Sequence, residues 1–233
     1  MPPARSPVWL SSELRFPPVH WATREGILAL GGDLSGQRLI LAYASGIFPW
    51  PGEDLPLLWF APPERAVVAP SNVHVGRSLR KVVDRRQFEV RMDTAFSQVI
   101  AACAHIPRRH ENGTWILPEM QTAYCALHDA GLAHSVETYE DNELVGGLYG
   151  VSLGGMFFGE SMFAKADDAS KVAMVHLSRR LALWNFDLID GQVMNPHIER
   201  LGFALIPRTE YMARLEQSLK KPTRQGKWTV EEK

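Results

Sequence analysis

A carboxylate and an amide lie two residues apart in the C-terminal half of the sequence. Asp190 and Gln192 stand in the largely apolar run LIDGQV (188–193), whose composition is typical of a strand. Because alternate residues of a strand face the same side of a sheet, we expect the two side chains to point the same way. A buried carboxylate beside a buried amide is costly without partners, so the pair is a candidate functional site. A strand end turned to solvent is the alternative.

A second carboxylate ends a long uncharged run. Glu160 closes the stretch GLYGVSLGGMFFGE and is followed by the apolar Met162 and Phe163. A carboxylate that emerges from a glycine-rich, aromatic strand suggests a site for a cation. The alternative is a charge at the end of a hairpin.

Two tryptophans and a basic segment are suited to contact nucleic acid. Trp50 and Trp115 lie in the loop sequences FPWP and NGTWILP, and such tryptophans either stack on unpaired bases or anchor packing. The chain carries a net charge of −1, but eight basic against three acidic residues give residues 77–110 a net +5. Four basic against twelve acidic residues give residues 111–190 a net −8. The basic side chains most suited to a phosphate backbone are Arg77, Arg80, Lys81 and Arg85.

Composition and apolar periodicity predict a folded chain with both helices and strands. With 45% hydrophobic and 22% charged residues, disorder and collagen-like repeats are excluded. A helix is expected from Ser35 to Ser45, and another from about residue 168 to 185 carries Met174, Leu177 and Leu181 on one face. We therefore predict an α+β (α/β-like) fold in which a mixed sheet is flanked by helices. Further helices are expected over 78–86, 94–106, 120–132 and 209–219, and strands over 87–93, 133–163, 187–193 and 203–207.

The organisation of the chain is expected to be a small N-terminal domain, residues 1–69, and a larger domain, residues 70–233. The polar segment from about residue 220 is expected to fray. We expect a cytoplasmic protein without membrane contact, because the first residues lack a signal-peptide pattern and no apolar run is long enough to span a bilayer. Cys103 and Cys125 are expected to be free thiols, because their spacing with nearby histidines matches no common zinc site.

Eight stretches of the sequence, taken together, resemble the bacterial leucyl/phenylalanyl-tRNA–protein transferases. They run in the family's order from about residue 16 to 215, and departures at Phe60-Ala61, Ala164 and Gly191 are confined to flanking positions. The stretches are GILALGGDL (26–34), AYASGIFPW (42–50), WFAPPERAV (59–67), HSVE (134–137), LVGGLYG (144–150), GESMF (159–163), ASK (169–171) and LIDGQ followed by PH (188–197).

The resemblance implies a C-terminal domain similar to the N-acetyltransferase (GNAT) fold, with no metal and no coenzyme. It implies transfer of Leu or Phe, and Met less well, from aminoacyl-tRNA to the N-terminal Arg or Lys of an acceptor protein, which marks that protein for degradation. We expect a monomer whose partners are Leu-tRNA or Phe-tRNA, bound at the 3′ end and acceptor stem, and proteins that begin with Arg or Lys.

The resemblance also suggests a role for each candidate residue. Trp50 and Trp115 would flank the 3′-terminal adenosine, and the four basic side chains named above would meet the acceptor-stem phosphates. Asp190, Gln192 and Glu160 would form the reaction centre. Because a neutral amide is a poor base, we expect Gln192 to orient the reactants and the two carboxylates to attract the cationic acceptor. The side chains that would line the donor pocket are Leu148, Phe157, Met174, Leu177, Leu181 and Ile189.

Two other functions fit part of the sequence. A GNAT-type acetyltransferase would bind acetyl-CoA, but the helix after the glycine-rich strands begins behind Asp167 and Asp168, whose charges repel a pyrophosphate. A non-catalytic RNA- or peptide-binding module would bind aminoacyl-tRNA without transferring its amino acid. An assay for transfer separates this module from an enzyme.

Overall fold

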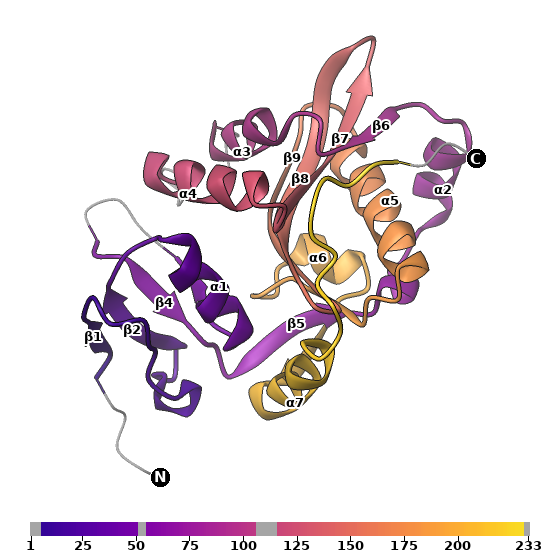
Figure 1. Ribbon diagram of the computed structural model, residues 1–233. Coiled ribbons are helices and arrows are strands. Elements are labelled where there is room, and N and C mark those ends of the chain that lie inside the picture. Colours follow the sequence, from indigo (N-terminus) through magenta and orange to yellow (C-terminus); the bar gives the residue numbers. More distant parts are fainter. Residues whose placement is uncertain (1–5, 51–54, 106–115, 231–233) are drawn as a thin grey trace.

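Two β-sheets organise the chain. The computed structural model describes residues 6–50, 55–105 and 116–230. The smaller sheet, in the order β1-β2-β4-β3, lies at the left of Figure 1. The larger sheet has the order β11-β5-β10-β9-β8-β7-β6, and its neighbours are antiparallel except for the parallel pair β9 and β10. The strands are β1 (Val8–Leu10), β2 (Ile27–Gly31), β3 (Phe48–Pro49), β4 (Leu58–Phe60), β5 (Glu64–Val68), β6 (Glu89–Met92), β7 (Ala133–Glu140), β8 (Glu143–Leu153), β9 (Met156–Ala164), β10 (Leu188–Asp190) and β11 (Ala204–Pro207).

Helices cover both faces of the larger sheet. A Cβ atom on Gly146 would meet Ala169, at the start of α5, whereas one on Gly147 would meet Val99 of α3, so successive residues of β8 face different helices. The expected fold class, a mixed sheet flanked by helices, is confirmed. In the described part of the chain, none of these helices has the length and apolar character needed to cross a bilayer. The helices are α1 (Gly36–Ala44), α2 (Arg77–Asp84), α3 (Phe96–His105), α4 (Pro118–Asp129), α5 (Ala169–Leu183), α6 (Pro196–Arg200) and α7 (Arg208–Ser218).

The predicted helices form close to their expected limits. The Ser35 side chain accepts a hydrogen bond from the Arg38 N–H at 3.4 Å and so caps α1. Gly46, with a φ of +73°, takes the chain out of that helix. The strand expected over 187–193, in contrast, ends at Asp190.

The N-terminal sheet shares an apolar core with the larger sheet. Tyr43 of α1 belongs to the same buried cluster as Tyr124 of α4 and Phe158 of β9. Strand β5 falls within the predicted N-terminal segment but pairs in the larger sheet with β10 and β11. The division into residues 1–69 and 70–233 stays a prediction.

The C-terminal segment differs from the expected frayed tail. After α7 it runs back along the larger sheet, as the yellow trace of Figure 1 shows. The Thr223 hydroxyl accepts a hydrogen bond from the Gly154 N–H at 2.9 Å, and the Trp228 N–H donates to the Asp93 carboxylate at 2.7 Å. Trp228 is only 2% exposed. Burial of this large ring outweighs the polar composition that suggested disorder.

Candidate active site

A cavity of about 690 Å³ opens where the end of β9, the loop after β10 and the start of α5 meet. Its walls are largely apolar, and Trp50 reaches it from the N-terminal segment. Eight of the residues predicted for the site line it: Trp50, Leu148, Phe157, Glu160, Met174, Ile189, Asp190 and Gln192.

Two residues predicted for the donor pocket do not line this cavity. Leu177 and Leu181 are fully buried in the apolar cluster behind Met174, because they lie further along α5. Trp115 lies outside the described residues. Phe203 lines the cavity although the sequence pattern did not single it out.

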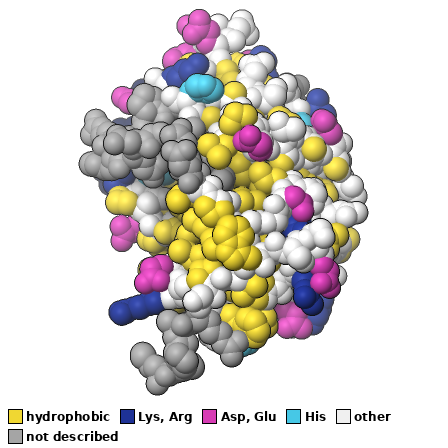
Figure 2. All heavy atoms as spheres, turned by 90° about the vertical axis from the view of Figure 1, so that its left-hand side faces the viewer, with side chains coloured by type: hydrophobic (Ala, Val, Ile, Leu, Met, Phe, Trp, Pro, Cys, Tyr) yellow, Lys and Arg dark blue, Asp and Glu magenta, His cyan; other side chains and the backbone are white. Residues whose placement is uncertain are grey.

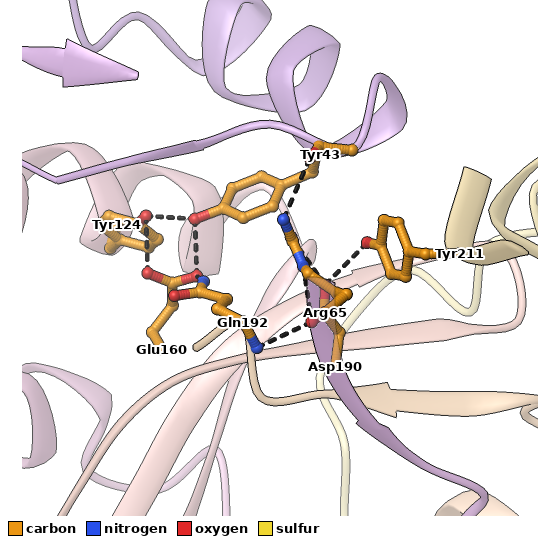
Figure 3. Close-up of polar contacts among 8 residues, drawn as sticks. Tyr43, Arg65, Tyr124, Glu160, Asp190, Gln192 and Tyr211 are labelled. Atoms are coloured by element: carbon orange, nitrogen blue, oxygen red, sulfur yellow. Dashed lines mark hydrogen bonds and ion pairs between the residues drawn. The ribbon is translucent and has the colours of Figure 1, made fainter. Parts of the chain in front are cut away.

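Glu160 is held by three uncharged donors (Figure 3). Its Oε1 accepts from the Tyr43 hydroxyl at 2.7 Å and from the Gln192 side-chain amide at 2.6 Å, and its Oε2 accepts from the Tyr124 hydroxyl at 3.0 Å. Burial raises the pKa of Glu160 to about 7; the three hydrogen bonds oppose the rise and the charge of Asp190 adds to it. A carboxyl group with this pKa is suited to exchange a proton near neutral pH.

The two tyrosines come from helices that lie far apart in the sequence. Tyr43 belongs to α1 and Tyr124 to α4, and their hydroxyls are hydrogen-bonded to each other. Burial raises the pKa of both phenols well above the ordinary value, so both stay protonated, and each has one hydrogen to donate, either to Glu160 or to the other hydroxyl. Tyr43 falls in the stretch AYASGIFPW; we found no sequence signal for Tyr124.

Asp190 is the centre of a second polar network (Figure 3). Arg65 donates from Nε at 2.9 and 3.0 Å and from Nη2 at 2.8 Å, and the Tyr211 hydroxyl donates at 2.7 Å. Burial lowers the pKa of Arg65, but the charge of Asp190, the hydrogen bonds to it and the nearby Tyr211 and Glu160 together outweigh burial, and the net pKa lies above the ordinary value. Arg65 balances the Asp190 charge, which weakens the field that this carboxylate presents to a cationic acceptor; the expected attraction stays a prediction.

Gln192 does not lie on the strand that carries Asp190, so the expected extended backbone at this position is wrong. β10 ends at Asp190, and Gln192 has a φ of +61°. Its N–H donates to Asp190 Oδ1 at 2.8 Å while its side chain turns to Glu160. Alternation of faces holds only for extended backbone, and here an aspartate captures the N–H two residues on. Left-handed backbone at a residue other than glycine is uncommon, and Gln192 is one of seven such residues in the described part of the chain.

Arg65 also ties the N-terminal segment to the site. Its Nη1 donates to the Gly46 carbonyl at 3.1 Å, and its guanidinium lies 4.5 Å from the ring centre of Phe48 and 4.6 Å from that of Tyr211. Sequence reasoning missed Arg65. The sequence signal that could have identified it is a charged residue directly before the apolar run AVV of β5.

The four predicted tRNA-contacting residues are all exposed on α2 and at its C-cap. Leu79 and Val83 are buried in a cluster with residues of α5, which turns the basic side chains outward. α2 lies at the right of Figure 1. Figure 2 shows the opposite side, where charged side chains of both signs are scattered around a hydrophobic centre.

The described residues hold no cluster of three or more His, Cys, Asp or Glu side chains that could bind a metal ion. Cys103 and Cys125 are free thiols.

Among solved structures, one titled as a GCN5-related N-acetyltransferase from Kribbella flavida resembles part of the chain. The match has a TM-score of 0.40 and 9% sequence identity, and it covers 72% of this chain and 59% of that one.

Comparison with known sequences covers nearly the whole chain. The family described as leucyl/phenylalanyl-tRNA protein transferase matches residues 67–216, and the family of its N-terminal domain matches residues 32–63. A leucyl/phenylalanyl-tRNA–protein transferase of Myxococcus xanthus is 52% identical over 226 residues, which are 96% of this chain and 97% of that protein. One of an Anaeromyxobacter species is 50% identical over 222 residues, 95% of this chain and 94% of its own. The chain belongs to the leucyl/phenylalanyl-tRNA–protein transferase family of aminoacyltransferases.

Proposed function

We propose that this enzyme transfers Leu or Phe, and Met less well, from aminoacyl-tRNA to the N-terminal Arg or Lys of an acceptor protein, which gives that protein a degradation signal. The proposal rests on one observation: an apolar cavity is lined at one point by a carboxyl group with a pKa of about 7. Such a cavity suits an uncharged side chain, and such a carboxyl suits an amine that must lose a proton. A cytoplasmic monomer that needs no cofactor stays our prediction.

The donor is proposed to place its side chain against the apolar wall of the cavity, which includes Phe157, Met174 and Ile189. A wall of this kind discriminates by about 1–3 kcal/mol per methylene group. Trp50 lines the same cavity, and we propose that it and Trp115 flank the terminal adenosine. Stacking of a base on an aromatic ring is worth roughly 1–3 kcal/mol.

The reaction forms one bond and breaks one. The lone pair of the acceptor's α-amine attacks the ester carbonyl carbon of the aminoacyl-tRNA, and the C–O bond to the ribose then breaks. The amine nitrogen loses a proton and the ribose oxygen gains one. Glu160 is proposed to accept the first proton and supply the second, because its pKa of about 7 lies close to the roughly 7.7–8.0 of an α-amine.

Gln192 is proposed to orient the reactants. One hydrogen of its side-chain amide goes to Glu160, and the amide lines the cavity, where its second hydrogen and its oxygen can hold the amine or the carbonyl. Asp190 is proposed as a positioning residue, since it holds the Gln192 backbone N–H and is itself paired with Arg65.

We propose that the Glu160 carboxylate attracts the cationic side chain of the acceptor's N-terminal residue. The described hydrogen-bond partners of its carboxylate are all uncharged, whereas Asp190 faces a guanidinium. A carboxylate without a cation partner attracts an arginine or lysine side chain more strongly than a neutralised one.

Contact between α2 and the tRNA gives a testable prediction. Reversal of Arg80, Lys81 and Arg85 to Glu is expected to weaken tRNA binding and to lower the slope of log K against log salt by about two to three, if each side chain meets one phosphate. Binding is measured by fluorescence anisotropy over a salt series. Reversal of three exposed residues elsewhere, Arg15, Arg214 and Lys220, is the matched control. If the salt dependence of binding is unchanged in both the α2 variant and the control, the tRNA does not contact α2.

The proposed function is tested directly by transfer. Radiolabelled Leu-tRNA and peptides that begin with Arg, Lys or Ala are incubated with the protein, and labelled peptide is counted. We expect label on the Arg and Lys peptides and none on the Ala peptide. Tight binding of Leu-tRNA without transfer to any peptide indicates a non-catalytic binding module. Acetylation of the peptides by acetyl-CoA indicates an acetyltransferase.

A further inference from the structure

The C-terminal segment reaches the apolar cluster that backs the cavity. The family match ends at residue 216, and the segment that follows α7 is fixed beyond that point by backbone and side-chain contacts. The Gly226 N–H donates to the Gly131 carbonyl at 3.0 Å, and the Gln225 side chain donates to the Ala130 carbonyl at 2.8 Å. These contacts deliver Trp228 to one place in the core.

Trp228 is held on several sides. Its indole stacks on His134 with the ring centres 3.6 Å apart and the planes 4° from parallel, and the Trp184 ring meets it edge-on at 4.9 Å. Its backbone N–H donates to Asp93, whose other side-chain contacts include His134 at 2.8 Å. Ring stacking and a charge-assisted hydrogen bond together leave the indole a single position.

Phe157 connects Trp228 with the cavity. The Phe157 ring centre lies 6.0 Å from that of Trp228, and Phe157 lines the cavity. The Phe157 ring packs directly against the backbone of Gly150 on β8. A side chain at position 150 would not fit, because its Cβ atom would lie only 2.7 Å from two atoms of the ring. Gly150 is the register partner of His134, on which Trp228 stacks. Packing is therefore continuous from Trp228 through Phe157 to the cavity wall.

We propose that Trp228 is a positioning residue that sets donor specificity: it fixes the Phe157 ring and thereby the depth of the pocket for the donor side chain. This inference rests on the proposed function, in which Phe157 contacts that side chain. A smaller residue at position 228 leaves space behind Phe157, into which the ring can move, so the pocket deepens and favours a larger donor.

The test measures the ratio of kcat/KM for Phe to that for Leu, with both amino acids charged on one tRNA body so that only the side chain differs. Trp228→Leu is expected to raise this ratio about fivefold, less than the tenfold or more of a methylene in direct contact. Trp228→Phe, which keeps a ring on His134, is expected to raise it about twofold. Phe88→Leu, which shortens an aromatic residue in a different buried cluster, is the control and is expected to leave the ratio unchanged.

Coupling to Phe157 distinguishes a role in specificity from loss of stability. In a Phe157→Leu background the ring that Trp228 fixes is absent, so Trp228→Leu is expected to leave the ratio within about twofold. The inference is overturned if the folded Trp228→Phe variant keeps the wild-type ratio, if the ratio shifts toward Leu, or if it shifts equally with and without Phe157. Absence of transfer by the wild-type protein contradicts the proposed function instead.

Discussion

The Glu160→Gln variant is expected to lower kcat/KM for transfer by about 10²- to 10⁴-fold, the usual contribution of a general base. Glutamine has the shape of glutamate, and its oxygen at the Oε1 position can still accept from Tyr43 and Gln192 while its NH2 group donates to the Tyr124 hydroxyl oxygen, but it cannot take a proton from the attacking amine. The loss is measured with labelled Leu-tRNA and an Arg-initiated peptide. The fold is expected to persist, because the change removes a charge that burial disfavours.

The pH dependence separates a lost base from a distorted site. In the wild-type enzyme both Glu160, with its pKa of about 7, and the acceptor amine, with a pKa of roughly 7.7–8.0, must be deprotonated. Below about pH 6.5, kcat/KM should therefore fall toward 100-fold per pH unit. In Glu160→Gln only the amine titrates, so the fall should be tenfold per unit. An equal slope in both proteins rules out Glu160 as the proton acceptor.

The free energy of unfolding should also depend on pH, because the pKa of Glu160 differs between the folded and the unfolded protein. The folded protein holds the Glu160 proton more tightly than the unfolded chain, because burial raises the pKa above the ordinary 4.5. The free energy of unfolding therefore falls as pH rises from about 5 through 7, and this contribution is absent in Glu160→Gln. Urea denaturation of both proteins at several pH values measures it.

Two further variants serve as controls for Glu160. Glu137 is also fully buried and is held by the Thr94 hydroxyl at 2.9 Å and by the Ser135 hydroxyl, but it does not line the cavity. Glu137→Gln is expected to keep most of the activity. Tyr124→Phe removes a hydrogen bond that lowers the Glu160 pKa, so the fall in activity should begin at a higher pH.

Local sequence patterns predicted the elements of this fold but not the contacts between them. The spacing of Met174, Leu177 and Leu181 placed α5 correctly, because an amphipathic helix is a property of one segment. The Tyr43 hydroxyl that holds Glu160 comes from 117 residues away in the sequence. Such a partner is set by how helices pack on the sheet, which spacing along the chain does not encode.

The reaction centre was predicted in its residues and only partly in its geometry. The motifs brought Asp190, Gln192 and Glu160 to one cavity, as expected. The assumption of an extended strand did not predict the left-handed backbone of Gln192, whose N–H donates to the Asp190 carboxylate. The ion partner of Asp190 was not predicted, because Arg65 lies 125 residues away in the sequence.

The second large effect is expected at the buried ion pair. Arg65→Met leaves the Asp190 carboxylate buried without its cation, and Asp190→Asn leaves the Arg65 guanidinium buried without its anion. Each change is expected to cost about 3–5 kcal/mol of unfolding free energy and most of the transfer activity. Urea denaturation and the transfer assay measure the two losses.

Combination of the two changes separates the charge of Asp190 from its geometry. In Arg65→Met with Asp190→Asn neither charge remains, so the free energy of unfolding should exceed that of either single variant. The asparagine oxygen, placed at the Oδ1 position, can still accept the Gln192 N–H that holds the left-handed turn, and its NH2 group can donate to the Tyr211 hydroxyl oxygen. If Asp190 acts only by positioning Gln192, transfer should recover at least tenfold over Asp190→Asn alone. A double variant that is folded yet as inactive as Asp190→Asn shows instead that the negative charge itself acts in the reaction, and Asp190 then counts among the groups that stabilise the forming ammonium.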